Sequence, residues 1–434
     1  MSIQTVTVIG ANGTMGCNVS ALFASFGGAK VYMVSRDIEQ SRKAVARAVK
    51  SVRADSIAAN LVPADYSMLE QCIRKSDLVF ESVAESLEDK LEVAHRIAMY
   101  ANSDTILATG SSGLSIKTLA ESYPYELRKN FFGVHMFNPP YSLTLCEVIR
   151  TPYSDNDLFG QLRSYLDQIL HRAVVEVKDR PAFLGNRIGF QFINRAMQFA
   201  EKYQYSGGID YIDAILGTFT GRAMPPIVTA DFVGLDVHKA IVNNIRDNTV
   251  DYDSGVFELP AYVQTLIAEK QLGRKSGCGL YKKVTYENDT KRTLVYDITT
   301  KTYRDKLVYE FPFAVQMKEA LREGDYEHAF YILITNRSAE ADICSEFLLQ
   351  YIVYSLYASK SVGYDVHGAD DVMAMGFNWC PPLAMADALS TVTDLKTLVK
   401  KRLAPKMLEA INVDALLEML EPSHYDYRPY FKSI

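Results

Sequence analysis

The sequence lacks several features that would assign it to other classes of protein. Its 434 residues contain no apolar run that approaches the roughly 20 residues of a membrane-spanning helix. Its six cysteines form no Cys-x-x-Cys pair or other metal-binding spacing, which is typical of reduced thiols. The 46 basic residues are interspersed among 52 acidic ones, so the net charge is -6 and no basic cluster forms. We therefore expect no membrane contact, no metal site and no nucleic-acid partner.

The composition and the N-terminal residues are typical of an ordinary globular protein. Hydrophobic residues make up 48% of the chain, and the length predicts two to four domains. The first five residues lead directly into an apolar segment, without the regions that make a signal peptide. The sequence therefore predicts a cytoplasmic protein.

A glycine-rich turn follows the first apolar segment, residues 5–10. The turn contains Gly10, Gly13 and Gly16, with Met15 inside it, and residues 19–26 then have helical spacing of their apolar side chains. Glycines let the backbone approach a pyrophosphate, and the helix that follows offers free N–H groups to it. Strand, glycine turn and helix in this order predict a dinucleotide site.

Further strand-like segments support that interpretation. Residues 30–34, 77–80 and 105–108 are apolar and are separated by intervals with helical spacing. Alternating strands and helices predict a doubly wound parallel sheet of the Rossmann type.

The second of these strands ends in Ser35 and Arg36, where an NAD-binding protein usually has an acidic residue. A hydroxyl and a guanidinium suit a 2′-phosphate, so we expect NADP or NAD, with NADP favoured. The alternative is that Asp37 binds the ribose in a shifted register.

Two neighbouring strand-like segments, residues 131–140 and 143–149, carry one imidazole and one carboxylate. If the second is a strand, Glu147 lies on the same face as Leu143, Leu145 and Ile149, and a carboxylate among buried hydrophobic residues needs a partner. His135 is the obvious candidate, and such a pair is suited to acid–base catalysis near neutral pH. The alternative is a structural histidine and a glutamate paired with a surface lysine.

The chain resembles the 3-hydroxyacyl-CoA dehydrogenase family over nearly all of its length. In layout it is most similar to bacterial and archaeal members with a doubled C-terminal helical domain, although the enoyl-CoA hydratase domain that follows in those proteins is absent. The most specific motifs lie at residues 133–140, 146–148, 180–189, 272–281 and 376–379.

The resemblance implies a role for several residues. His135 would be the catalytic base and Glu147 its partner, while Ser112, Asn138 and Asn186 would hold the substrate, Ser112 and Asn186 taking part in catalysis. Glu85 and Lys90 match positions that contact the cofactor in the family. One departure is Gly110, which replaces an amide. As structural alternatives, Ser112 would cap a helix starting near Ser115, and Asn186 would cap the helix at 187–200.

The C-terminal half is predicted to be helical and repetitive. The phrase Pro-Pro-x-x-x-Ala-Asp occurs at residues 225–231 and again at 381–387, each time after a turn rich in aspartate and a helix. We therefore predict a dinucleotide-binding domain at 1–180 and two all-α domains like those of 6-phosphogluconate dehydrogenase, at 181–283 and 336–434. Residues 284–335 are expected to form a linker with a small hairpin at 292–303.

The resemblance further implies hydride transfer between a nicotinamide and carbon 3 of an acyl-CoA thioester, as in fatty acid β-oxidation. A separate enoyl-CoA hydratase is a possible partner, and the chain is expected to be a monomer or a homodimer. Two alternatives stay open. One is a 6-phosphogluconate-like dehydrogenase acting on a free hydroxy acid, and the other is a catalytically silent scaffold that binds CoA or nucleotide.

Overall fold

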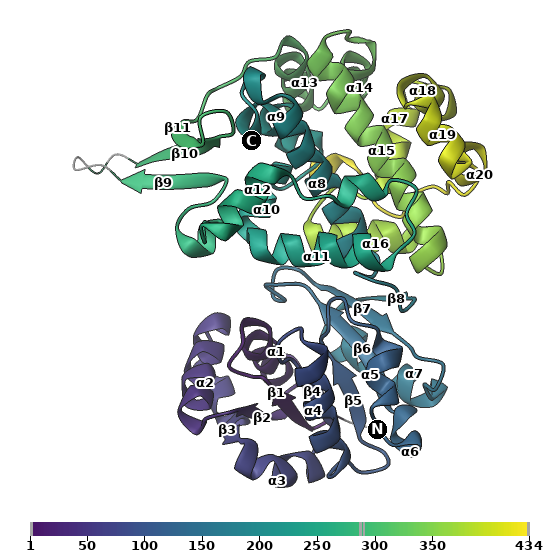
Figure 1. Cartoon of the computed structure of the whole chain (residues 1–434). Coiled ribbons are helices and arrows are strands. Elements are labelled where there is room, and N and C mark those ends of the chain that lie inside the picture. Colours follow the sequence, from purple (N-terminus) through teal and green to yellow (C-terminus); the bar gives the residue numbers. More distant parts are fainter. Residues whose placement is uncertain (1–2, 286–288, 290, 432–434) are drawn as a thin grey trace. The chain divides into compact units, whose positions relative to one another are not determined.

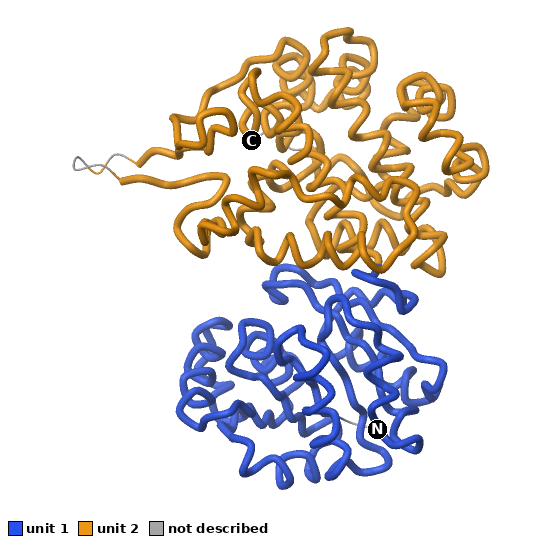
Figure 2. The backbone as a smooth tube through the Cα atoms, in the orientation of Figure 1, with its two compact units in different colours: residues 1–183 blue, residues 184–434 orange. Residues whose placement is uncertain are grey.

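The computed structural model describes residues 3–285, 289 and 291–431. The chain divides into two compact units, residues 1–183 and residues 184–434 (Figures 1 and 2). Among the described residues, no helix combines the length and the apolar character needed to cross a membrane.

The first unit is built on an eight-stranded sheet in the order β3-β2-β1-β4-β5-β6-β7-β8. Neighbouring strands are parallel except β6 and β7, which are antiparallel. The strands are β1 (Thr5–Ile9), β2 (Lys30–Ser35), β3 (Leu61–Asp65), β4 (Leu78–Glu81), β5 (Ile106–Thr109), β6 (Phe131–Met136), β7 (Leu145–Ile149) and β8 (Ala173–Val177). This order, with helical crossovers, is the doubly wound arrangement expected from the sequence.

Helices cover both faces of this sheet. They are α1 (Thr14–Ser25), α2 (Ile38–Val52), α3 (Leu69–Arg74), α4 (Leu87–Ala98), α5 (Ile116–Glu121), α6 (Tyr125–Arg128) and α7 (Asn156–Ser164). Val134 and Met136 of β6 belong to the hydrophobic core that the sheet forms with α1, α2 and α7. Because successive side chains of a strand point to opposite faces, His135 lies on the other face of the sheet.

The structure corrects the predicted sheet in four details. Strands β6 and β7 are antiparallel, although a parallel sheet was predicted, and β8 was not predicted. Strand β3 was missing from the prediction because Leu61–Asp65 contains Pro63, which disfavours a central strand. Proline is tolerated here because β3 is an edge strand. The strand expected at 143–149 begins only at Leu145, so Leu143 does not share its face with Glu147.

The second unit is mainly helical, as predicted. Its helices are α8 (Gly185–Lys202), α9 (Ile209–Ile215), α10 (Pro226–Val233), α11 (Leu235–Asn248), α12 (Ala261–Ala268), α13 (Pro312–Glu323), α14 (Tyr326–Thr335), α15 (Ala339–Val362), α16 (His367–Phe377), α17 (Pro382–Ser390), α18 (Leu395–Arg402), α19 (Pro405–Ile411) and α20 (Val413–Leu417). The described residues also form a small antiparallel sheet of β9 (Tyr281–Thr285), β10 (Lys291–Asp297) and β11 (Thr302–Asp305).

The segment expected to be a linker is more structured than a hairpin. Strands β10 and β11 form the predicted hairpin, but β9 pairs with β10 on its other side, and α13 and α14 follow. The hairpin alone was predicted because only residues 292–303 alternate around a polar turn.

The repeated phrase has the same local structure in both copies. Pro225 and Pro381 stand at the N-caps of α10 and α17. In the first copy Asp213 of α9 accepts a hydrogen bond from the Ile227 N–H at 2.8 Å. In the second, Asp370 of α16 accepts one from the Leu383 N–H at 2.7 Å. Each copy therefore binds the N-terminus of its Pro-Pro helix with an aspartate from the preceding helix.

The two copies pack against each other within this unit. Phe192 of α8 makes edge-to-face contacts with Phe347 of α15 and with Trp379, at centroid distances of 5.2 and 5.4 Å. Arg222 forms an isolated antiparallel bridge with Trp379, and its guanidinium lies 4.9 Å from the indole centroid. Both side chains are almost fully buried.

Candidate active site

The glycine turn after β1 packs so closely against neighbouring backbone that two of its positions admit no side chain. Gly10 has a φ of +84°, and a Cβ there would lie 2.4 Å from the Ser82 carbonyl oxygen. A Cβ at Gly16 would lie 2.3 Å from the Gly10 carbonyl oxygen. Gly13 is the N-cap of α1 without a side-chain cap bond, and Met15 packs against the core. This cradle at a helix N-terminus fits the pyrophosphate of a dinucleotide.

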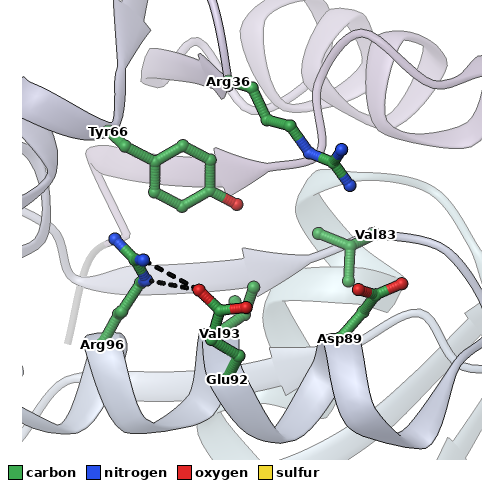
Figure 3. A pocket seen from close by; sticks show the side chains of 7 residues that line it. All are labelled: Arg36, Tyr66, Val83, Asp89, Glu92, Val93 and Arg96. Atoms are coloured by element: carbon green, nitrogen blue, oxygen red, sulfur yellow. Dashed lines mark hydrogen bonds and ion pairs between the residues drawn. The ribbon is translucent and has the colours of Figure 1, made fainter.

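A pocket of about 290 Å³ lies next to the turn, beyond the C-terminal end of β2. Figure 3 shows Arg36 and the ring of Tyr66 facing helix α4, which contributes Asp89, Glu92 and Arg96. A second pocket, of about 260 Å³, shares Arg36 and Tyr66 and extends to Gly10 and Gly13. Two of the glycines predicted to bind the pyrophosphate and the residues predicted to bind the 2′-phosphate therefore line the same second pocket.

Ser35 and Arg36 differ in what their side chains offer to a ligand. Ser35 is 2% exposed, and its hydroxyl shares a hydrogen bond with Ser41 Oγ, although the residue lines the second pocket. Arg36 is exposed and lines both pockets. Asp37, the alternative ribose ligand, caps α2 by accepting hydrogen bonds from the Glu39 and Gln40 N–H groups through Oδ1. The guanidinium is thus the more available group.

His135 and Glu147 form a buried pair on adjacent antiparallel strands. The register of β6 and β7 sets them directly opposite each other, and His135 Nδ1 lies 2.8 Å from Glu147 Oε2. The residues are 4% and 0% exposed. The rings of Phe137 and Phe183 pack against the imidazole at centroid distances of 4.8 and 5.4 Å. An imidazole held by a carboxylate in apolar surroundings is the arrangement of a general acid–base group.

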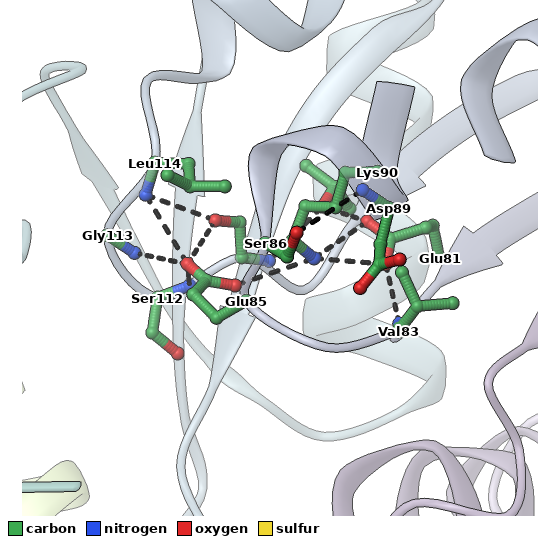
Figure 4. A network of polar contacts seen from close by, with 11 residues as sticks. Glu81, Val83, Glu85, Ser86, Asp89, Lys90, Ser112, Gly113 and Leu114 are labelled. Carbon is green, nitrogen blue, oxygen red and sulfur yellow. Dashed lines mark hydrogen bonds and ion pairs between the residues drawn. The ribbon is translucent and has the colours of Figure 1, made fainter. Parts of the chain in front are cut away.

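Glu85 holds the loop that carries Ser112. Its Oε1 accepts hydrogen bonds from the Ser111 hydroxyl and from the N–H groups of Ser112, Gly113 and Leu114 (Figure 4). Burial would raise the pKa of Glu85, but the charge of Lys90 and these hydrogen bonds outweigh it and lower that pKa. The helix α5 is capped by Ser115 and not by Ser112, so the structural alternative for Ser112 was wrong.

Lys90 is a buried residue. Its side chain is 2% exposed, and Nζ lies 3.0 Å from both oxygens of Glu81 and 3.4 Å from Glu85 Oε2. The position expected to contact the cofactor is therefore an internal counter-ion in this structure. Sequence reasoning missed Glu81, although an acidic residue ending a buried strand was a signal that it needs a partner.

The remaining predicted residues lie in different units. Asn138 is exposed, and its Oδ1 accepts a hydrogen bond from Asn18 Nδ2 of α1 at 2.9 Å. Asn186 lies in the first turn of α8, is 6% exposed, and is not the N-cap, which is Leu184. The interpretation of Asn186 as a helix cap was therefore wrong.

At Gly110, a Cβ would lie 3.0 Å from Phe80 Cζ, which explains why a small residue stands there.

Comparisons with known proteins agree with this geometry. The model of the 3-hydroxyacyl-CoA dehydrogenase NAD-binding domain matches residues 5–180, and that of the C-terminal domain of the same family matches residues 183–283. A probable 3-hydroxyacyl-CoA dehydrogenase from Deinococcus radiodurans is 32% identical over 320 residues, covering 70% of this chain and 90% of the relative. One from Bacillus subtilis is 28% identical over 319 residues, covering 73% of this chain but only 39% of the relative's length.

A solved structure resembles nearly the whole chain. The 3-hydroxybutyryl-CoA dehydrogenase of Escherichia coli matches with a TM-score of 0.67 at 20% identity, covering 98% of this chain and 97% of that one. At this identity the match shows the shared fold.

The Rossmann-type sheet with its glycine turn and the matched NAD-binding domain define an oxidoreductase that uses a nicotinamide cofactor. More narrowly, the chain belongs to the 3-hydroxyacyl-CoA dehydrogenase family. The predicted fold class and family are thereby confirmed.

Proposed function

We propose that this protein interconverts (S)-3-hydroxyacyl-CoA and 3-oxoacyl-CoA by hydride transfer with a nicotinamide cofactor. The observation that carries the proposal is the buried pair of His135 and Glu147, on the same sheet as the glycine turn, in a member of this family. A silent scaffold would need no such pair, because hydrophobic residues in the same place are often equally or more stabilising than two buried ionisable groups.

The proton chemistry falls to His135. Since Nδ1 is bound to Glu147, the proton exchanged with the substrate hydroxyl would be carried by Nε2. Glu147 stabilises the imidazolium formed when that proton is taken up, and it keeps one tautomer of the neutral ring. The bound nicotinamide supplies the hydride acceptor or donor. Ser112, Asn138 and Asn186 would position the substrate oxygens through hydrogen bonds.

We favour NADP over NAD as the cofactor. Arg36 is the exposed group at the end of β2, and a guanidinium binds a phosphate in bidentate fashion. Ser35 contributes less than the sequence suggested, since its hydroxyl is already bonded to Ser41. The carboxylate of Asp37 is partly used as the cap of α2, which weakens the NAD alternative.

We also propose that the second helical copy takes the place of a dimer partner and that an enoyl-CoA hydratase, on a separate chain or on the same polypeptide, acts with this enzyme. Support for the first point is the apolar contact of Phe192 with Phe347 and Trp379 between the copies. For the second, two Rickettsia relatives, 24% identical, bear the name of a putative fatty acid oxidation complex trifunctional enzyme.

The experiment that tests the function is an absorbance assay of acetoacetyl-CoA reduction with NADH and NADPH in parallel. Turnover with either cofactor is expected, and a higher kcat/KM with NADPH would support the role of Arg36. No turnover with either cofactor, in protein shown to be folded, would contradict the proposal.

A further inference from the structure

Glu81 is a buried carboxylate to which none of the proposed roles applies. It ends β4, is 4% exposed, and lies opposite Ile9 on one neighbouring strand and Thr109 on the other. Its Oε1 accepts a hydrogen bond from the Val83 N–H at 2.6 Å, and its Oε2 accepts one from Thr109 Oγ1 at 2.7 Å. A carboxylate with this many hydrogen bonds fixes the positions of the groups that donate to it.

Lys90 lies between Glu81 and Glu85 and forms an ion pair with each. An ammonium group has three N–H donors. The Lys90 Nζ donates to both oxygens of Glu81 at 3.0 Å and forms an ion pair with Glu85 Oε2 at 3.4 Å. Because the side chain is 2% exposed, Lys90 offers almost no surface to a ligand.

The two carboxylates together hold the whole loop after β5. Glu81 binds Thr109, whose Oγ1 accepts a hydrogen bond from the Ser111 N–H at 3.2 Å. Glu85 binds the next three N–H groups, at 2.9, 2.9 and 3.3 Å (Figure 4). Thr109 is paired with Gly133 in the sheet, two residues before His135. The loop with Ser112 therefore follows the strand next to the one that carries the proposed base.

We infer that Glu81 and Lys90 are positioning residues, which fix the Ser112 loop through Glu85 and Thr109. The inference rests on the proposed dehydrogenase function.

A double-mutant cycle of Glu81→Gln and Ser112→Ala tests the inference. Two carboxylates share one ammonium in the wild type, so Glu81→Gln leaves a matched pair and the protein is expected to fold. We expect kcat for acetoacetyl-CoA reduction to fall by about tenfold to a hundredfold, the cost of a misplaced reacting group. The loss should be strongly non-additive with that of Ser112→Ala. The dissociation constant of NADH, measured by fluorescence, should stay within about twofold of the wild type.

The matched control is Glu88→Gln, which makes the same change at an exposed position in the first turn of α4. It should leave kcat and the NADH dissociation constant unchanged. When it is combined with Ser112→Ala, the effects of the two substitutions should be additive. Additive losses in the cycle, or NADH binding weakened as much as kcat, would overturn the inference.

Amide hydrogen exchange separates this inference from the proposed function. In Glu81→Gln the amides of Ser111, Ser112, Gly113 and Leu114 should exchange faster than in the wild type and in Glu88→Gln. If the wild type shows no dehydrogenase turnover, the proposed function fails, but this readout still decides whether Glu81 holds the loop. Unchanged exchange of these amides would overturn it.

Discussion

Tyr281 and Ser423 occupy matching positions in the two helical copies. Tyr281 donates its backbone N–H to Asp231 at 3.3 Å and its hydroxyl to Asp213 at 2.7 Å. Ser423 donates its backbone N–H to Asp387 at 2.9 Å and its hydroxyl to Asp370. In each copy, two aspartates thus bind one residue of a distant segment. One is the last residue of the repeated phrase, and the other is the aspartate that binds the N-terminus of the Pro-Pro helix.

Burial of these aspartates predicts a pH dependence of stability. Burial raises the pKa of Asp213 to about 7 and that of Asp370 to about 7. In the unfolded chain an aspartate has a pKa of about 3.9. Each group therefore makes its full contribution to the free energy of unfolding below about pH 4. As the pH rises from there towards 7, the unfolded chain loses this proton while the folded protein keeps it, so the contribution is lost, by on the order of 1–4 kcal/mol.

The variant Asp213→Asn should remove this contribution. We expect its free energy of unfolding in urea to fall less than that of the wild type between pH 5 and pH 7.5. The comparison must be made with the wild type because other groups titrate in this range. Burial lowers the pKa of His238 to about 3, which costs stability as the pH falls below about 6.5. Asp247→Asn, at an exposed position, is the control, and parallel curves for wild type and Asp213→Asn would contradict the prediction.

His135→Gln should reduce kcat by about a hundredfold to ten-thousandfold, the usual contribution of a general acid–base group. Binding of the nicotinamide cofactor, measured by fluorescence titration, should change little, because the glycine turn is intact. A rate near that of the wild type would show that His135 is not the base.

Arg36→Ala should weaken NADPH binding by about 1.5–3 kcal/mol while NADH binding changes little. The reason is that only NADPH carries a 2′-phosphate, which would accept hydrogen bonds from the guanidinium. The measurement is a fluorescence titration with each cofactor. Arg42→Ala removes a neighbouring exposed guanidinium of α2 and serves as the control. Equal losses for both cofactors in Arg36→Ala would mean that Arg36 does not recognise the 2′-phosphate.

Two glycines inside helices should respond in opposite ways to alanine. A Cβ at Gly160 of α7 meets no atom within 4 Å, so Gly160→Ala should stabilise the protein by about 0.5–1 kcal/mol. A Cβ at Gly189 of α8 would lie 2.3 Å from Phe377 Cζ, so Gly189→Ala should destabilise it by about 1–3 kcal/mol. Urea unfolding of both variants provides the measurement, and effects of the same sign would contradict the prediction.

Light scattering should report the mass of one chain, 48.7 kDa, if the second helical copy replaces a dimer partner. A mass twice as large would contradict that role.

Periodicity along the chain, together with the dinucleotide-binding pattern that precedes it, predicted the pairing of His135 with Glu147. A strand with alternating side chains puts Glu147 on the face of its apolar neighbours Leu145 and Ile149, and a buried carboxylate needs a partner. The glycine turn was equally readable, because strand, glycines and helix follow one another within residues 5–26. Both features depend on residues close together in sequence.

Other features depend on contacts that sequence order does not reveal. Ser35 was expected to face a phosphate, but its hydroxyl is turned towards Ser41, one turn into the next helix. Lys90 was expected at the cofactor, but its partner Glu81 lies on a strand nine residues earlier. The pattern of apolar residues predicts which side of an element is buried, and it does not show which polar groups meet there.

The bridge between Arg222 and Trp379 shows what a repeat within one chain permits. In a symmetric homodimer every substitution at the interface appears on both sides, so each surface must fit a copy of itself. Here the two facing surfaces belong to different stretches of one gene, and a substitution in either leaves the other unchanged. The two copies are therefore free to diverge in sequence while they stay complementary.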